Sequence, residues 1–148
     1  MPPPPDLDVL LVQFVYPGMT EPESAVFRDF LEARGREYDR FDFNVRLGAG
    51  AEPAEGLTGV YEALAVKLTQ KRADVVSWLA GRPTIIEVKI RIGLGAQGQL
   101  LGYRSLWVRD RPGEPEPALL AIARRTDADT LAALGDQGID VILYEDRP

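Results

Sequence analysis

The chain has 148 residues, a net charge of −6 at pH 7, and neither cysteine nor histidine. This composition excludes disulfides, thiolate nucleophiles, zinc-thiolate sites, Ser-His-Asp hydrolases and nucleases that rely on a histidine base. Hydrolysis by such a chain would need carboxylates, lysine and a hard cation such as Mg²⁺ or Mn²⁺, which prefers oxygen ligands.

Residues 1–7 are proline-rich and are predicted to form an extended lead-in to a single domain over residues 8–148. The first residues lack the basic and apolar regions of a signal peptide, so we expect a cytoplasmic location. No apolar run approaches the roughly 20 residues of a membrane-spanning helix, so we expect no membrane partner. Residues 8–18 are apolar and fit either a first strand or a short buried helix.

A helix is predicted over residues 20–35, with Thr20 as its N-cap, acidic residues in its first turn and Gly35 as its terminator. The alternating segment 36–48 predicts a strand that ends at Gly48. A loop over 49–56 follows. Residues 57–72 fit either a helix or a strand, and their four-residue apolar spacing favours a helix.

The second half predicts a β-hairpin and then alternating helices and strands. The order of elements implies an α/β sandwich around a mixed central sheet. The expected elements are a hairpin over 73–90 with its turn at 80–83, a helix over 93–108, a strand over 118–124, a helix over 126–138 and a strand over 139–145.

Polar residues interrupt the apolar pattern of the predicted hairpin. A turn at residues 80–83 pairs Asp74 with Lys89 and Val76 with Glu87. Because side chains alternate along a strand, Asp74, Glu87 and Lys89 would share one face within roughly 5 to 8 Å. The opposite face would be apolar and would hold Val75, Leu79, Ile86, Val88 and Ile90.

This cluster has the composition of a metal site. Two carboxylates at such a separation repel each other, which favours a divalent cation between them. A hard cation with open positions binds a phosphate oxygen and a water together, and it lowers the pKa of that water. Lys89 would position the water, help to deprotonate it or offset charge at the phosphate, and residue chemistry does not separate these roles. The alternative is a solvated strand face whose ion pair contributes less than about 1 kcal/mol.

The stretches "RAD" and "IIEVK" of this hairpin resemble the motif of the PD-(D/E)XK nuclease superfamily. Asp74 matches the first aspartate of that motif, and Glu87, Val88 and Lys89 match its E-x-K. Ala73 departs from the pattern, because the family name expects proline there.

Downstream, "QLLGY" supplies Gln99 and Tyr103, which are similar to the Q-x-x-x-Y motif of the RecB-like branch. On a helix these two residues share one face, where they would orient the site and touch a nucleic-acid backbone. Ordinary packing is the alternative. The resemblance covers residues 20–145 in element order and residues 72–103 in motif.

The resemblance implies a Mg²⁺- or Mn²⁺-dependent nuclease that hydrolyses DNA, within a restriction-endonuclease-like α/β sandwich. Asp74, Glu87 and the main-chain carbonyl of Val88 would hold the metal, and Lys89 would act on the attacking water. Gln99 and Tyr103 would support the site.

Family members often add a metal-binding glutamate from the first helix, and Glu23 is our candidate for this role. Glu21 and Glu62 compete with it, and the acids at 21 and 23 also fit a helix N-terminus without any metal. Five basic residues near the motif suggest either a phosphate-binding rim or a solvated surface: Lys67, Lys71, Arg72, Arg91 and Arg104.

Two other functions remain open from the sequence. The first is a non-catalytic nuclease-fold module for nucleic-acid binding or assembly, although clustered carboxylates argue against it. The second is self-association through the apolar segment Val9–Tyr16. A homodimer is also compatible with the nuclease hypothesis. Trp78 and Trp107 are expected in the core or at an interface rather than as base-stacking platforms.

Overall fold

A five-stranded mixed sheet forms the centre of the computed structural model, which describes residues 6–50, 59–61, 63 and 70–146. The first two strand pairings are antiparallel and the last two are parallel. The protein is therefore a mixed α/β protein, as the order of elements predicted. The strands lie in chain order: β1 (Arg40–Leu47), β2 (Lys71–Leu79), β3 (Arg82–Val88), β4 (Ala118–Ala123) and β5 (Ile139–Leu143).

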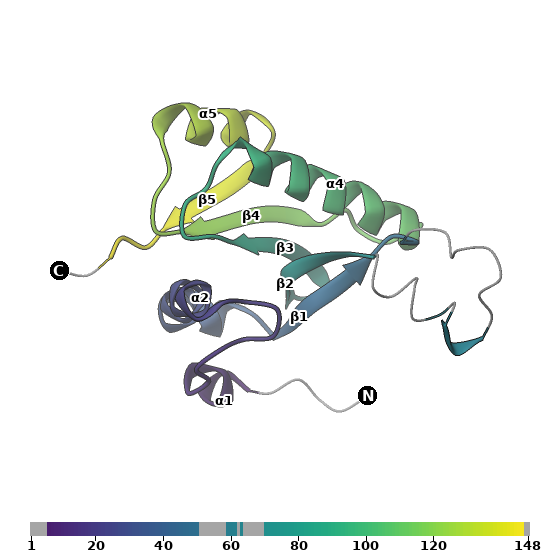
Figure 1. The fold of residues 1–148 in the computed structure, drawn as a ribbon, viewed down its shortest axis with the longest axis horizontal. Coiled ribbons are helices and arrows are strands. Elements are labelled where there is room, and N and C mark those ends of the chain that lie inside the picture. Colours follow the sequence, from purple (N-terminus) through teal and green to yellow (C-terminus); the bar gives the residue numbers. More distant parts are fainter. Residues whose placement is uncertain (1–5, 51–58, 62, 64–69, 147–148) are drawn as a thin grey trace.

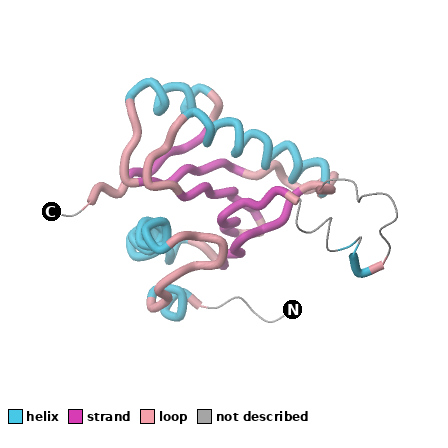
Figure 2. The backbone as a smooth tube through the Cα atoms, viewed as in Figure 1, coloured by secondary structure: helices cyan, strands magenta, loops and turns pink. Residues whose placement is uncertain are grey.

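Helices cover both faces of this sheet (Figure 1). Helices α1 (Leu7–Leu11) and α2 (Glu21–Arg34) pack on one face, and α4 (Leu94–Asp110) and α5 (Ala128–Asp136) pack on the other. Figure 2 shows the sheet as the middle of three layers. None of the helices in the described ranges is long and apolar enough to span a bilayer.

The start of α2 follows from its sequence. The Thr20 hydroxyl accepts a hydrogen bond from the Glu23 N–H at 3.3 Å, and Glu23 Oε1 accepts one from the Thr20 N–H at 2.9 Å. This reciprocal capping box confirms the predicted N-cap. Helix α2 ends at its C-cap Gly35, as predicted; the φ of this residue is −58°, and the chain continues into the short 3₁₀ helix η1 (Gly35–Glu37).

Two apolar cores lie on either side of the sheet. The core beneath α2 holds Phe27, Phe30 and the β3 residues Ile86 and Val88. The core beneath α4 holds Trp107, which is 1% exposed and contacts Trp78, so both tryptophans are structural aromatics as expected. The undecided segment 8–18 contributes α1 and Tyr16 to the α2 core.

Most of the predicted helix over 57–72 lies outside the described residues. Glu62 and Lys67 are both among the residues that are not described. Its last two residues belong to β2, which begins at Lys71 rather than at Ala73. The units β3-α4-β4 and β4-α5-β5 each connect parallel strands through a helix, and both helices lie on the same face. This connection places α4 directly after the E-x-K strand.

Candidate active site

The turn between β2 and β3 contains two residues instead of the predicted four. Ala80 and Gly81 have φ angles of 50° and 75°, so both are left-handed. Two consecutive left-handed residues form the type I′ turn, whose twist matches that of a hairpin. Alanine rarely adopts this conformation, which is why the sequence pointed to a longer turn.

The shorter turn corrects the predicted register. Val75 is paired with Ile86, the last pair of the ladder, and the carboxyl groups of the following residues, Asp74 and Glu87, are close enough to shift each other's pKa. The predicted pairing of Asp74 with Lys89 is therefore wrong. Because the error is two residues, the carboxyl groups still share a face. The apolar face also forms as predicted, except for Leu79, which lies beside the turn and is 48% exposed.

Asn44 of β1 lies beside Asp74 and has a φ of 51°, which is rare for a non-glycine residue in a strand. The ladder between β1 and β2 continues on either side of this position without a change of register. The strands nevertheless change face here. Phe43 and Val75 pack toward α2, whereas Val45 and Ala73, two residues further along, pack toward α4 instead of the same face.

Gly18 fits against this irregular residue. A β-carbon at Gly18 would lie 2.9 Å from Asn44 Oδ1, and the φ of Gly18 is 79°. Asn44 was missed by the sequence reasoning. Its signal was present, because asparagine is depleted in strands and tolerates the left-handed conformation better than most residues.

Asp74 and Glu87 form a carboxyl pair at this irregularity. Glu87 is only 3% exposed, and its Oε2 has no hydrogen-bond partner within the described ranges. Asp74 Oδ2 accepts a hydrogen bond from the Val88 N–H at 2.9 Å, which ties β2 to the E-x-K strand. A buried acid with an unpartnered oxygen is unfavourable for folding, so it marks a candidate binding site.

Burial changes the acidity of both groups. It is the main reason that the pKa of Glu87 rises from 4.5 to about 8, and the Asp74 charge adds to this rise while Lys89 opposes it. Burial also raises the pKa of Asp74, although the Val88 N–H favours its charged form. At neutral pH the pair therefore retains a proton, which a bound cation would displace.

Lys89 lies at the edge of the pair, just after β3 ends. Its Nζ is 3.4 Å from Glu87 Oε1, and its side chain is 36% exposed. The lysine is thus in contact with both the buried acid and the solvent. Such a position suits a group that meets a substrate entering from outside.

Gln99 and Tyr103 of α4 line one cavity of about 520 Å³, as expected for residues one helical turn apart. Burial raises the pKa of Tyr103 to about 12, and the charges of Glu87 and Asp74 add to this rise. The phenol is therefore within electrostatic reach of the carboxyl pair. Gln99 shares the cavity but makes no described hydrogen bond with the pair.

Glu23 is less closely associated with the site. Its charge contributes to the raised pKa of Asp74, so Glu23 lies within electrostatic reach of that carboxyl group. Its Oε1 is occupied by the capping box with Thr20. Two of the basic residues considered for a rim are ion-paired: Arg91 with Asp127 at 3.5 Å and Arg104 with Glu116 at 3.1 Å.

The carboxyl pair fits a magnesium-like ion. No group of three or more potential ligating side chains occurs among the described residues, so the pair would supply two carboxylates. Mg²⁺ commonly binds to one or two protein carboxylates and completes its shell with water and substrate phosphates. The unpartnered Oε2 of Glu87 and the mutual repulsion of the pair agree with this mode. The roles of the Val88 carbonyl and of Glu23 stay predictions.

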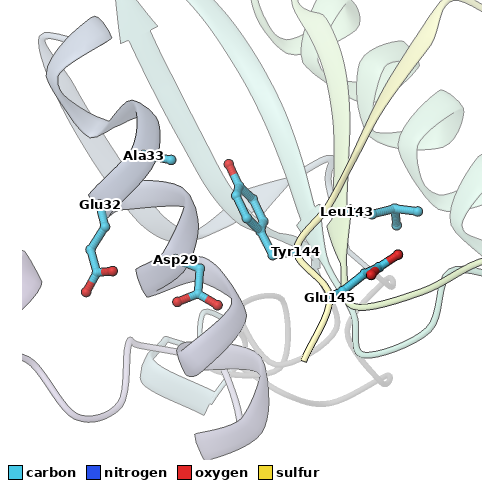
Figure 3. A pocket seen from close by; sticks show the side chains of 6 residues that line it. All are labelled: Asp29, Glu32, Ala33, Leu143, Tyr144 and Glu145. Carbon is cyan, nitrogen blue, oxygen red and sulfur yellow. The ribbon is translucent and has the colours of Figure 1, made fainter. Parts of the chain in front are cut away.

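A separate cavity of about 560 Å³ lies between α2 and the end of β5 (Figure 3). Three carboxylates line it, from Asp29, Glu32 and Glu145, and Arg124 forms an ion pair with the first of them. None of the predicted site residues lines this cavity. Its acidic lining would repel a phosphate, so it is not the candidate nuclease site.

Comparison with known proteins gives no relative: no family model, no curated protein and no solved structure matches the chain. The function must therefore be inferred from the site itself.

Proposed function

We propose that the protein is a Mg²⁺- or Mn²⁺-dependent nuclease that hydrolyses DNA phosphodiester bonds, with a restriction-endonuclease-like fold of the PD-(D/E)XK type. The main support is the buried carboxyl pair of Asp74 and Glu87, with an unpartnered oxygen and with Lys89 beside it. The mixed sheet with helices on both faces agrees with this proposal.

Asp74 and Glu87 would hold the metal, together with the main-chain carbonyl of Val88, and Glu23 is a further candidate ligand from α2. A cation bound there supplies charge stabilisation at the phosphate and lowers the pKa of a water molecule. The Val88 N–H holds one oxygen of Asp74 in place, which leaves the other oxygen for the metal.

The remaining side chains act on the substrate. Lys89 faces both the carboxyl pair and the solvent, so it orients the attacking water or neutralises a phosphate oxygen. The Tyr103 hydroxyl remains protonated at neutral pH because its pKa is about 12, and it can therefore donate a hydrogen bond to the substrate backbone. Gln99 lies one turn earlier on the same helix face and orients the strand.

The test is cleavage of single- and double-stranded DNA with Mn²⁺ by wild type and by Asp74→Asn and Lys89→Gln. Asparagine retains the acceptor for the Val88 N–H, so the first variant removes charge and keeps the hydrogen bond. We expect each variant to lose on the order of 100-fold or more in rate. Asp129→Asn, at an exposed position of α5, is the matched control, and cleavage that survives both site substitutions would refute the assignment.

A non-catalytic nucleic-acid-binding module is the second candidate, and the observation that favours it is the absence of a third potential ligating side chain beside the pair among the described residues. Calorimetry with Mn²⁺ separates the two functions. Heat of binding that disappears in Asp74→Asn supports the nuclease. DNA binding without any metal binding supports the module.

A further inference from the structure

A continuous groove along α4 leads away from the candidate site. Its first part is the cavity lined by Gln99 and Tyr103, and its second part is an adjoining cavity of about 450 Å³ beside Gly48 and Arg109. The two cavities share the side chains of Lys71 and Leu106, so they form one path along the helix. From Gln99 to Arg109 the helix rises about 15 Å.

Two cations line this path without a partner among the residues that the structure describes. Lys71 and Arg109 are exposed, and neither makes an ion pair or side-chain hydrogen bond with another described residue. This distinguishes them from Arg91 and Arg104, which are neutralised by neighbouring acids. Two cations that have no acidic partner in the described part of the chain provide a local attraction for an anionic ligand, although the net charge of the chain is −6.

The floor of the groove is flat and largely apolar. Gly98 and Gly102 leave the surface of α4 open, because a β-carbon at either position would meet no atom within 4 Å. Leu106 and the ring of Tyr103 supply apolar surface beside them. Such a surface suits the exposed faces of unpaired bases, which stack on apolar and aromatic side chains.

Resting on the proposed nuclease function, we propose that this α4 groove, lined by Lys71, Gly98, Gly102, Leu106 and Arg109, binds a single strand of DNA and leads it to the carboxyl pair. At a spacing of about 3.4 Å per nucleotide, the 15 Å path holds about four nucleotides. A duplex would bring about twice that charge and would hide its bases from the apolar floor. Two cations on an acidic protein match the single strand better.

Binding of a fluorescein-labelled 15-nucleotide oligothymidine, measured by anisotropy in EDTA, tests the groove separately from cleavage. For a single strand, the association constant is inversely proportional to the salt concentration raised to a power of about 0.7 for each phosphate contact. Two contacts therefore predict about a sevenfold loss of affinity between 50 and 200 mM salt. Each of Lys71→Gln and Arg109→Gln removes one phosphate contact. If such a contact contributes nothing at 1 M salt, each variant should bind about eightfold more weakly than wild type at 50 mM salt.

Matched variants separate the groove from general charge and from folding. The double variant Arg36→Gln/Arg82→Gln removes two exposed cations outside the groove and should leave binding within about twofold. Gly102→Leu should block the groove, whereas Gly95→Leu, on the same helix but outside the groove, should bind normally. Both leucine variants should keep or raise the melting temperature, because glycine costs a helix about 1 kcal/mol.

The inference is overturned if the groove variants bind oligothymidine like wild type, if the two leucine variants behave alike, or if a 15-base-pair duplex binds more tightly than the single strand. Cleavage assays with Mn²⁺ on the same variants separate this inference from the nuclease proposal. Cleavage that is insensitive to the groove variants would refute the groove alone. Oligothymidine binding that depends on the groove, together with no cleavage by wild type, would refute the nuclease proposal and leave the groove as a binding site.

Discussion

The protonated state of Glu87 makes a direct prediction about stability. A carboxyl whose pKa is 4.5 when unfolded and about 8 when folded stabilises the folded protein fully below pH 4.5. This contribution decreases as the pH rises and is absent above pH 8. At about 1.4 kcal/mol for each pH unit, the free energy of unfolding falls by about 5 kcal/mol over that window.

Glu87→Gln replaces the acid by a neutral group of similar shape, so the contribution of Glu87 to the pH dependence should disappear, and only the smaller contribution of the partly buried Asp74 should remain. We expect the variant to lie within about 1 kcal/mol of wild type at pH 5 and to exceed its stability by several kcal/mol at pH 9. Urea unfolding in EDTA at both pH values measures the difference. With a slope near 2 kcal/mol per molar urea, the midpoints should differ by about 2 M at pH 9.

Glu145→Gln is the control, because this exposed glutamate should give the wild-type curve at each pH. Parallel stability curves for wild type and Glu87→Gln between pH 5 and 9 would refute the reasoning. So would a variant that is less stable than wild type at pH 9, since the charged acid would then be favourable in the fold.

Three further predictions concern the same fold. If the proposed metal binds to the carboxyl pair, it displaces the proton on Glu87, so the affinity for Mn²⁺ in calorimetry should rise about tenfold per pH unit below pH 8. A pH-independent affinity would contradict this. Asn44→Gly should retain cleavage while Asn44→Val loses it, because valine resists the φ of 51°; equal activities would show that the conformation is unimportant. The side chains of Val12 and Phe14 are 83% and 67% exposed, so replacing both with serine should change the melting temperature by no more than about 2 °C. If Val9–Tyr16 mediates a homodimer, this variant should elute as a monomer in size-exclusion chromatography, where wild type elutes as a dimer.

The elements of the fold could be predicted where a local signal was strong. Thr20 and Glu23 define the start of α2 through a reciprocal hydrogen-bonded pair that depends only on sequence spacing. The apolar alternation of the hairpin likewise predicted its two faces. These signals are local, so no knowledge of the tertiary structure was required.

The register and the environment of the carboxyl pair could not be predicted in the same way. The left-handed conformation of Ala80 opposes its intrinsic preference and is imposed by the twist of the hairpin. The burial of Glu87 depends on the layers that cover the sheet, which the alternation pattern does not reveal. The left-handed conformation of Asn44, where the strands change face, brings its side chain against Gly18, a residue far away in the sequence.

The proton on Glu87 and the nearby Lys89 ammonium also bear on how the protein matures. Small zinc domains cannot fold before their metal arrives, because metal binding supplies their folding free energy. Here the proton lowers the charge of the pair. The Nζ of Lys89, 3.4 Å from Glu87 Oε1, supplies a positive charge beside the pair when no metal is bound. The chain can therefore complete its fold in a cell that is short of free Mn²⁺ or Mg²⁺. Under the proposed metal-dependent function, metal binding would then follow folding and be reversible, so that the supply of the ion would control activity without changing the amount of folded protein.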